Sequence, residues 1–447
     1  MTVEGADLVE GIWARDPTVW TGEDEAKWLG WLDEPMRDID LSRAPVGEYE
    51  DYVLLGMGGS SLAPEVFRRT FGATNFHVLD TTHPKAIRRL QDGIDAGSTF
   101  FLASSKSGTT LETRSHLEHF WELAGEKPEQ FAVVTDPGSE LEALAEERGF
   151  HAVFHGEPTI GGRYSALSAF GLVAAALMGA DVDRIRKRAR EMAEACRGTD
   201  NPGLKLGLQF GEGWGRGRDK ICIDDTPGGF GLWAEQLIAE STGKDGKGLV
   251  PAPGESPAAP DRQHAEVRLP DPHELGAEFF RWEFATAVAG AILGINAFNQ
   301  PDVQSAKDRT NEILAGGDDP DVEPSGSLDE LLGGAEEGNY VCVQAFIDPT
   351  DDNESRIMKL VELIRARTGC VTTHGFGPRY LHSTGQLHKG GPPIGRFVQI
   401  VDDTGDEIPI PGKPFGFGKL IRAQAAGDFA SLQERGRPIV RIRLEDL

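Results

Sequence analysis

The sequence predicts an α/β protein built from doubly wound parallel sheets. Short apolar stretches at residues 52–55, 76–79, 100–103 and 131–134 each have the length of a buried strand. Each stretch is followed by a turn rich in Gly, Ser, Thr or Asp, and a helical pattern comes next. Strands that alternate with helices at this spacing indicate a parallel sheet with helices on both of its faces.

The chain divides into an arm and two α/β domains. Residues 1–45 predict an N-terminal helical arm, and its four tryptophans (Trp13, Trp20, Trp28 and Trp31) are expected to dock it on the body. Residues 46–198 contain the four strands above and a helix-rich end. Residues 199–447 form the second domain. Its predicted strands are 220–223, 341–347 and 397–401, its helices 230–240, 279–293, 301–314 and 356–365, and its loops 251–263 and 315–338.

Composition restricts the classes of partner. The 447 residues carry a net charge of −27, which repels nucleic acids and anionic membranes. No apolar run approaches the length of a membrane span, and residues 1–11 do not resemble a signal peptide, so we expect a cytoplasmic protein. The four cysteines are scattered, which predicts neither disulfides nor a thiolate metal site. Acidic runs such as 318–323 and 402–407 are expected to be solvated.

Residues 104–110, with sequence SSKSGTT, predict a phosphate site. They lie between a predicted strand and a helix, where free N–H groups and the helix dipole favour an anion. Ser105, Ser107 and Thr110 can donate hydroxyl hydrogen bonds, and Lys106 can add a positive charge. An ordinary helix cap is the alternative, but a cap needs one hydroxyl and this turn has five.

A glycine-rich turn at residues 56–61, GMGGSS, allows a second interpretation. It follows a strand and precedes a helix, and Asp80 ends the next strand, as in a dinucleotide site. However, Ser61 stands where that motif has its third glycine. We therefore expect the turn to lie beside residues 104–110 and to contribute to the same compact phosphate site.

Two further segments contain residues suited to catalysis. Arg163 follows two glycines at the start of a helical segment, where it can stabilise developing negative charge. Gln236 and Glu240 share one helix face, and Glu240 comes just before a glycine turn. Spacing alone makes Glu240 a candidate base, although such pairs usually lie on the surface.

Five motifs, GMGGSSLAP, SSKSGTTLET, GGRYSALS, EQLIAESTGK and FNQPDVQSAK, together resemble the sugar-isomerase (SIS) fold family and, within it, phosphoglucose isomerase. The likeness is greatest to the isomerase half of bacterial transaldolase–phosphoglucose isomerase fusions. It implies two SIS domains, each with three α/β/α layers, and a place in glycolysis and gluconeogenesis.

The resemblance also implies residue roles. Arg163 matches the arginine that stabilises the enediolate, and Gln236 and Glu240 match the helix that carries the base. Gln300 and Lys307 match a glutamine and lysine near the sugar oxygens. The positions that match the surroundings of the sugar phosphate are Gly59, Ser60, Ser105, Lys106, Ser107 and Thr110.

The ring-opening histidine is harder to assign. Residues 380–390 resemble the histidine helix of the family, with His382 the best match and His388 a second candidate. In typical members this helix comes before the lysine, whereas here it follows Lys307, so the order of segments is rearranged. The family supplies this histidine from a neighbouring subunit, which implies a homodimer with shared sites.

The expected activity is glucose-6-phosphate isomerase, without a metal or another cofactor. Glu240 would be the base, His382 with Lys307 would act at the ring oxygen, and Arg163 would stabilise the enediolate. The alternatives are dual glucose and mannose 6-phosphate specificity, a non-catalytic sugar-phosphate sensor, and an NAD-dependent dehydrogenase. The resemblance also suggests a functional association with a separate transaldolase. The pairs His116/His119 and His151/His155 are expected to be packing or surface histidines.

Overall fold

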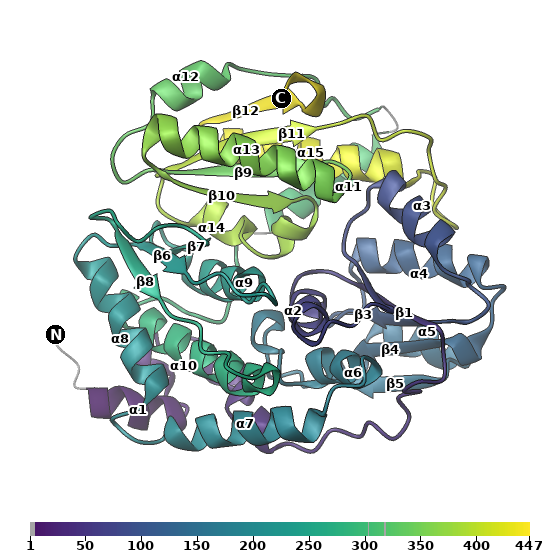
Figure 1. The fold of residues 1–447 in the computed structure, drawn as a ribbon, viewed down its shortest axis with the longest axis horizontal. Helices are drawn as coiled ribbons and strands as arrows, with labels where there is room; N and C mark the ends of the chain where they lie inside the picture. Colours follow the sequence, from purple (N-terminus) through teal and green to yellow (C-terminus); the bar gives the residue numbers. More distant parts are fainter. Residues whose placement is uncertain (1–4, 303, 317–318) are drawn as a thin grey trace.

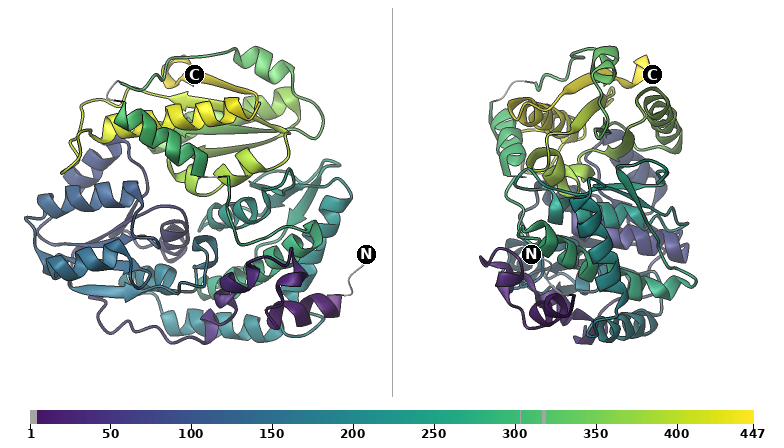
Figure 2. Two further views of the ribbon diagram at one scale, coloured as in Figure 1. Left: turned by 180° about the vertical axis from the view of Figure 1, so that it is seen from behind. Right: turned by 90° about the vertical axis from the view of Figure 1, so that its left-hand side faces the viewer.

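The computed structural model describes residues 5–302, 304–316 and 319–447 and contains three parallel β-sheets covered by helices (Figures 1 and 2). The predicted α/β class with parallel sheets is confirmed. No helix in these residues is both long and apolar enough to span a membrane.

The first sheet has five parallel strands in the order β2-β1-β3-β4-β5. The strands are β1 Asp51–Gly56, β2 Phe76–Leu79, β3 Thr99–Ser104, β4 Phe131–Thr135 and β5 Ala152–His155. Its helices are α2 Leu62–Phe71, α3 Pro84–Gly93, α4 Leu111–Leu123, α5 Glu140–Arg148 and α6 Ala169–Leu177. The prediction located the first four strands and missed the short β5.

Alternation of side chains fixes the two faces of this sheet. Val53 and Phe101 belong to the core beneath α4 and α5, whereas Leu54 and Leu102 pack against α6 on the opposite face. Because both faces are apolar, each strand reads as a continuous hydrophobic run. The carboxyl ends of β1 and β3 lead into the glycine turn and the hydroxyl-rich turn, and the direct pairing of these strands brings the turns together.

A second sheet has three parallel strands in the order β7-β6-β8. They are β6 Lys220–Ile223, β7 Val250–Pro253 and β8 Arg262–Ala265, and the helices around them are α7 Val182–Ala195, α8 Pro202–Gly215, α9 Gly231–Thr242 and α10 Leu275–Leu293. The prediction of a loop over residues 251–263 was therefore wrong at both ends. Prolines suggested a loop, but β7 is an edge strand, where a missing N–H is tolerated.

The N-terminal segment packs on this helical layer. It contains α1 Gly5–Trp13 and several short 3₁₀ turns. The ring of Trp13 stacks on Phe280 of α10, and the indole N–H of Trp20 donates to the Ala287 carbonyl at 2.8 Å. Trp31 stacks on Tyr164 with 5.3 Å between ring centroids, so the arm supports the residue next to Arg163.

Residues 319–447, here called the C-terminal unit, contain the third sheet, in the order β10-β9-β11-β12. Its elements are α12 Leu328–Gly333, β9 Tyr340–Phe346, α13 Asp351–Thr368, β10 Val371–Phe376, α14 Gly385–Gly390, β11 Gly395–Val401, α15 Phe417–Glu434 and β12 Ile439–Arg443; α11 Gln304–Ala315 precedes them. The predicted exposed connection over residues 315–338 was wrong in its second half, because Leu331 and Leu332 of α12 are buried.

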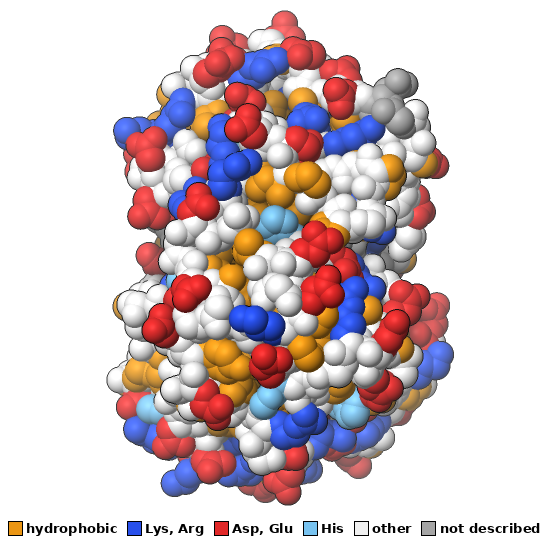
Figure 3. Space-filling view, turned by 90° about the vertical axis from the view of Figure 1, so that its right-hand side faces the viewer, with side chains coloured by type: hydrophobic (Ala, Val, Ile, Leu, Met, Phe, Trp, Pro, Cys, Tyr) orange, Lys and Arg blue, Asp and Glu red, His pale blue; other side chains and the backbone are white. Residues whose placement is uncertain are grey.

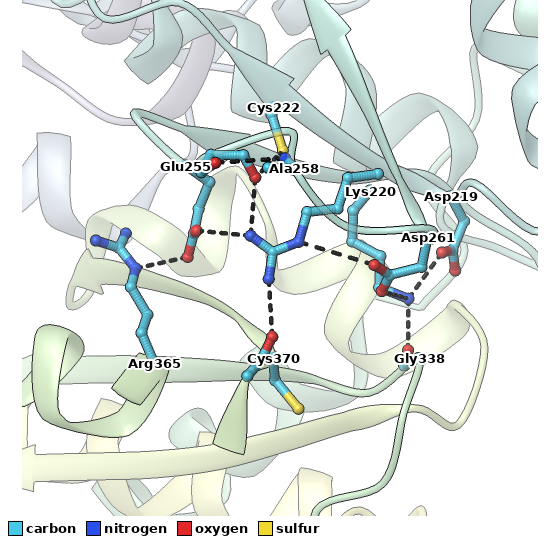
Figure 4. Close-up of polar contacts among 12 residues, drawn as sticks. Asp219, Lys220, Cys222, Glu255, Ala258, Asp261, Gly338, Arg365 and Cys370 are labelled. Carbon is cyan, nitrogen blue, oxygen red and sulfur yellow. Dashed lines mark hydrogen bonds and ion pairs between the residues drawn. The ribbon is translucent and has the colours of Figure 1, made fainter. Parts of the chain in front are cut away.

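The predicted second domain, residues 199–447, thus holds two hydrogen-bonded sheets. Their edge strands β7 and β10 lie close together, with Val250 and Val371 in one apolar cluster. Buried charges cross this junction (Figure 4). Glu255 accepts from Arg365 of α13 at 2.6 Å and from Arg262 of β8 at 3.2 Å, and Arg262 donates to the Gly369 carbonyl at 2.8 Å.

The acidic side chains are dispersed over the surface. In Figure 3 the face on the right of Figure 1 shows acids interspersed with lysines and arginines. In the two predicted acidic runs, Asp321, Glu323, Asp403 and Asp406 are exposed, as expected, and Asp318 lies outside the described residues. For Asp402 the prediction was wrong, because its side chain is 9% exposed and pairs with His83 at 2.8 Å. Glu323 forms an ion pair with Arg443 at 2.8 Å.

Candidate active site

A cavity of about 380 Å³ lies where the first sheet meets α11 and the C-terminal unit. The hydroxyl-rich turn and α4 form one wall through Ser107, Thr109, Thr110 and Glu112; Lys307 and Asn311 of α11 form another; His382, Lys389 and Gln424 close it from the C-terminal unit. Segments distant in sequence therefore share one polar chamber.

The hydroxyl-rich turn presents an anion-binding surface to this cavity. Thr110 precedes the first residue of α4 and makes no side-chain cap bond to it. The Ser105 and Thr110 hydroxyls are 2.9 Å apart, and those of Ser107 and Thr109 are 3.0 Å apart, so the turn is internally ordered. Hydroxyls at the N-terminal end of a helix are suited to a phosphate group.

Four of the six predicted phosphate residues lie outside the cavity lining: Ser105, Lys106, Gly59 and Ser60. Lys106 forms an ion pair with Asp136 and donates to the Glu157 carbonyl at 2.9 Å, away from the cavity lining. Lys307 supplies positive charge on the cavity wall, whereas the ammonium of Lys389 is paired with the buried Asp428 carboxylate.

The glycine turn packs against two other loops of the site. Gly58 has φ +56°, and a Cβ there would lie 2.6 Å from the His382 carbonyl oxygen. A Cβ on Gly59 would lie 2.1 Å from the carbonyl oxygen of Gly162. Close packing of backbones therefore accounts for these glycines. Asp80, the candidate ribose ligand, is instead 3.7 Å from the Arg379 guanidinium.

Arg163 is buried and holds several segments together. Its guanidinium donates to Ser241 Oγ at 2.8 Å, to the Ala297 carbonyl at 2.8 Å and to Gln300 Oε1 at 3.0 Å. Its Nη1 also lies 3.3 Å from Glu240 Oε1. The side chain is only 1% exposed, so its charge acts in a medium where electrostatic interactions are strong.

Helix α9 connects this arginine with the cavity. The side-chain amide of Gln236 donates to Glu240 Oε2 at 3.0 Å and to the His382 carbonyl at 2.9 Å. Its own Oε1 is buried and has no hydrogen-bond partner among the described residues. Glu240 is therefore held between Arg163 and Gln236, and Gln236 in turn contacts His382, which lines the cavity. Arg163, Gln236 and Glu240 are not themselves among the lining residues.

The two candidate histidines have different surroundings. His382 Nε2 bonds to Glu112 Oε1 at 2.9 Å on the cavity wall. Burial alone would raise the pKa of the Glu112 carboxyl, but its interaction with His382, which includes a hydrogen bond, and the charge of Lys307 outweigh burial and lower that pKa to about 2.

His388 lies in the core, with the rings of Tyr340, Tyr380 and Phe397 around it. Burial lowers the pKa of its imidazole well below the usual value. Of the two histidines, His382 is therefore the one placed to meet a ligand in the cavity.

Glu112, Lys389 and Gln424 were not singled out from the sequence. Glu112 occurs within SSKSGTTLET, where it was indistinguishable from an acid that stabilises the first turn of a helix. Gln424 and Lys389 carried no signal, because only the packing of the C-terminal unit brings them to the cavity wall.

All of these contacts occur within one chain. His382 meets Glu112, Gln236 and Gly58 of its own chain, although the resemblance implied a histidine from a neighbouring subunit. The late position of His382 in the sequence is compatible with this arrangement, because α9 and the first sheet precede it and the C-terminal unit folds back over both.

Sequence comparison points to one family for the first half of the chain. The family model described as phosphoglucose isomerase matches residues 35–198. A glucose-6-phosphate isomerase from Thermus thermophilus is 35% identical over 264 residues, which cover 54% of this chain and 62% of the relative. One from Acaryochloris marina is 32% identical over 265 residues, 53% of this chain and 50% of the relative.

Structural comparison supports the same fold. The crystal structure of a glucose-6-phosphate isomerase from Chlamydia trachomatis matches with a TM-score of 0.58 and 18% identity over 70% of this chain and 84% of that one. This protein therefore has the α/β fold of phosphosugar isomerases and is similar in sequence to phosphoglucose isomerases, and it spans about half to three fifths of the length of the curated relatives that it matches.

Proposed function

We propose that this protein interconverts glucose 6-phosphate and fructose 6-phosphate through an enediol intermediate. The observation that carries the proposal is the link made by His382. Its ring bonds to Glu112 on the wall of the hydroxyl-lined cavity, and its carbonyl accepts from Gln236, which also holds Glu240. His382 thus connects the proposed phosphate-binding turn with Glu240, the candidate base.

Each group has a distinct part in this chemistry. The hydroxyls of Ser107 and Thr110 and the end of α4 hold the phosphate, and Lys307 adds positive charge from another wall of the cavity. Glu240 takes the proton from one of C1 and C2 and returns it to the other, and Arg163 stabilises the negative charge of the intermediate. His382, backed by Glu112, moves the proton at the ring oxygen.

A coupled assay tests the proposal. Fructose 6-phosphate, with no added metal, should give glucose 6-phosphate, detected with a dehydrogenase specific for that product. Mannose 6-phosphate, followed separately, examines the dual-specificity alternative. If sugar phosphate binds but no C2 proton exchanges with solvent in deuterated water, the protein is a non-catalytic sensor and the proposal fails.

We further propose that one chain carries a complete set of catalytic groups. Mixed subunits of His382→Ala and Glu240→Gln should then remain inactive after confirmed exchange, because each chain lacks one of its own groups. Recovered activity would instead favour the shared homodimeric sites that the resemblance implies. The cytoplasmic location and the association with a separate transaldolase stay predictions.

A further inference from the structure

Gln424 lies on the cavity wall and has no role in the proposed chemistry so far. It comes from α15, is 3% exposed, and makes two side-chain hydrogen bonds. Its Nε2 donates to Glu112 Oε1 at 2.8 Å, and its Oε1 accepts from the Thr82 hydroxyl at 2.7 Å. Thr82 is fully buried at the end of the first sheet.

These partners fix the orientation of the amide. A carboxylate only accepts hydrogen bonds, so the NH₂ group of Gln424 must face Glu112. The amide oxygen then faces Thr82, whose hydroxyl can donate to it. The chain of contacts therefore has one direction, from the Thr82 hydroxyl through Gln424 to the carboxylate.

The same carboxylate oxygen receives His382. Glu112 Oε1 accepts from Gln424 Nε2 at 2.8 Å and bonds His382 Nε2 at 2.9 Å. Because the carboxylate accepts, Nε2 of His382 carries the hydrogen, and a neutral ring keeps its lone pair on Nδ1. Fixing Oε1 thus fixes both the ring orientation and the tautomer of His382.

We propose that Gln424, oriented by Thr82, is a positioning residue that sets the Glu112–His382 pair for proton transfer. The inference rests on the proposed isomerase function. The C-terminal unit then contributes two groups to the site: His382 itself, and the Gln424 amide, which holds Glu112 in position.

The test is Gln424→Met, which keeps the length of the side chain and removes both hydrogen bonds. We expect kcat for fructose 6-phosphate to fall about 10–100-fold, the scale of a small misplacement of a catalytic group, with KM changed by less than about threefold. Thr82→Val should lower kcat in the same direction by a smaller factor, and it provides the same measurement if Gln424→Met does not fold.

The decisive measurement is made in a His382→Ala background. If Gln424 acts through His382, adding Gln424→Met there should leave the residual rate of C2 proton exchange unchanged. The proposal is overturned if Gln424→Met lowers the rate by the same factor in the His382→Ala background as in the wild type. It is also overturned if Gln424→Met alone has the wild-type kcat. An inactive wild-type protein would instead reject the proposed function itself.

Gln344→Met is the matched control. Gln344 is fully buried and its amide lies 3.3 Å from Nδ1 of His388, the histidine in the core. The same substitution beside this histidine should lower the unfolding temperature and leave kcat within about twofold of the wild-type value, since it lies outside the cavity lining.

Discussion

The C-terminal unit meets the rest of the chain at two junctions that use buried charge differently. Against the three-stranded sheet, Glu255 is paired with Arg262 and Arg365 (Figure 4). Apolar side chains of β7 and β10 pack at the same junction. Against the first sheet, the charges of Lys307 and Glu112 border a cavity of about 380 Å³. At the first junction the buried charges pair with one another, whereas at the second the charges line a cavity that a ligand could occupy.

The difference teaches how to separate structural from functional charge. Both junctions contain buried acids, so burial alone does not distinguish them. At the structural junction each partner of Glu255 is another protein group, whereas the functional junction combines a cavity with an uncapped helix end. A bound substrate would fill this cavity and supply the hydrogen-bond partners that the protein does not provide there.

The largest effect is expected from Glu240→Gln. Loss of the base should lower kcat by about 10²–10⁴-fold or more and abolish C2 proton exchange, while sugar-phosphate binding is retained. Glu235→Gln on the same helix is the control: burial raises the pKa of the Glu235 carboxyl to about 8, so an amide replaces a group that is already mostly neutral at pH 7. Unchanged exchange in Glu240→Gln would remove this residue from the mechanism.

The structural junction is tested by Glu255→Leu. Removing this carboxylate leaves the charges of Arg262 and Arg365 without their shared partner, which should lower the free energy of unfolding by about 3–5 kcal/mol in urea titrations. At temperatures where the variant is folded, KM should be unchanged. Glu362→Leu, at an exposed site on α13, is the control. A stable Glu255→Leu protein with altered KM would reverse the assignment of the two junctions.

Glu112 gives the functional junction a pH signature. Its pKa in the folded protein is about 2, against 4.5 for an ordinary glutamate, so its carboxylate stabilises the fold above pH 4.5. This contribution is lost as the pH falls from about 4.5 toward 2. Glu112→Gln should therefore show a flatter decline of the free energy of unfolding across that window, and identical slopes for variant and wild type would exclude the charge pairing.

The smallest effect is expected from Ser107→Ala with Thr110→Ala. Ser107 is exposed and Thr110 is half-buried, so water replaces part of each lost hydrogen bond. At a net contribution of roughly 0.5–1.5 kcal/mol for each bond, KM for fructose 6-phosphate should rise about 5–150-fold with a smaller change in kcat. Ser115→Ala, on the buried face of α4, serves as the control. An unaltered KM in the double variant would mean that the phosphate binds elsewhere.

Much of the first sheet could be predicted because its strands are continuous apolar runs with turns after them. Strand β7 was missed because Pro251 and Pro253 suggest a loop unless the strand is known to lie at an edge. Strand β8 was missed because its four residues, RQHA, are mostly polar and show no apolar run. Strand order is set by tertiary packing, so the separation of β6–β8 from β9–β12 had no local signal.

The site shows the same division. Arg163, Glu240 and His382 lie within recognisable motifs, and the structure brings them together. Gln424 lies in the ordinary helical sequence of α15, and Lys106, although it lies in the motif, turns toward Asp136. Motifs indicate which segments converge, whereas the direction of each side chain depends on neighbours that are distant in sequence.

The order of these segments along the chain also affects synthesis. Glu112 is made early, whereas its partner His382 comes 270 residues later, from a unit whose last strand ends at Arg443. A nascent chain can therefore fold its first sheet before residue 382 is synthesised, yet it cannot form this pair until His382 has left the ribosome. Polypeptides released before residue 382 would lack the histidine, so the pair between the first sheet and the C-terminal unit could not form in them.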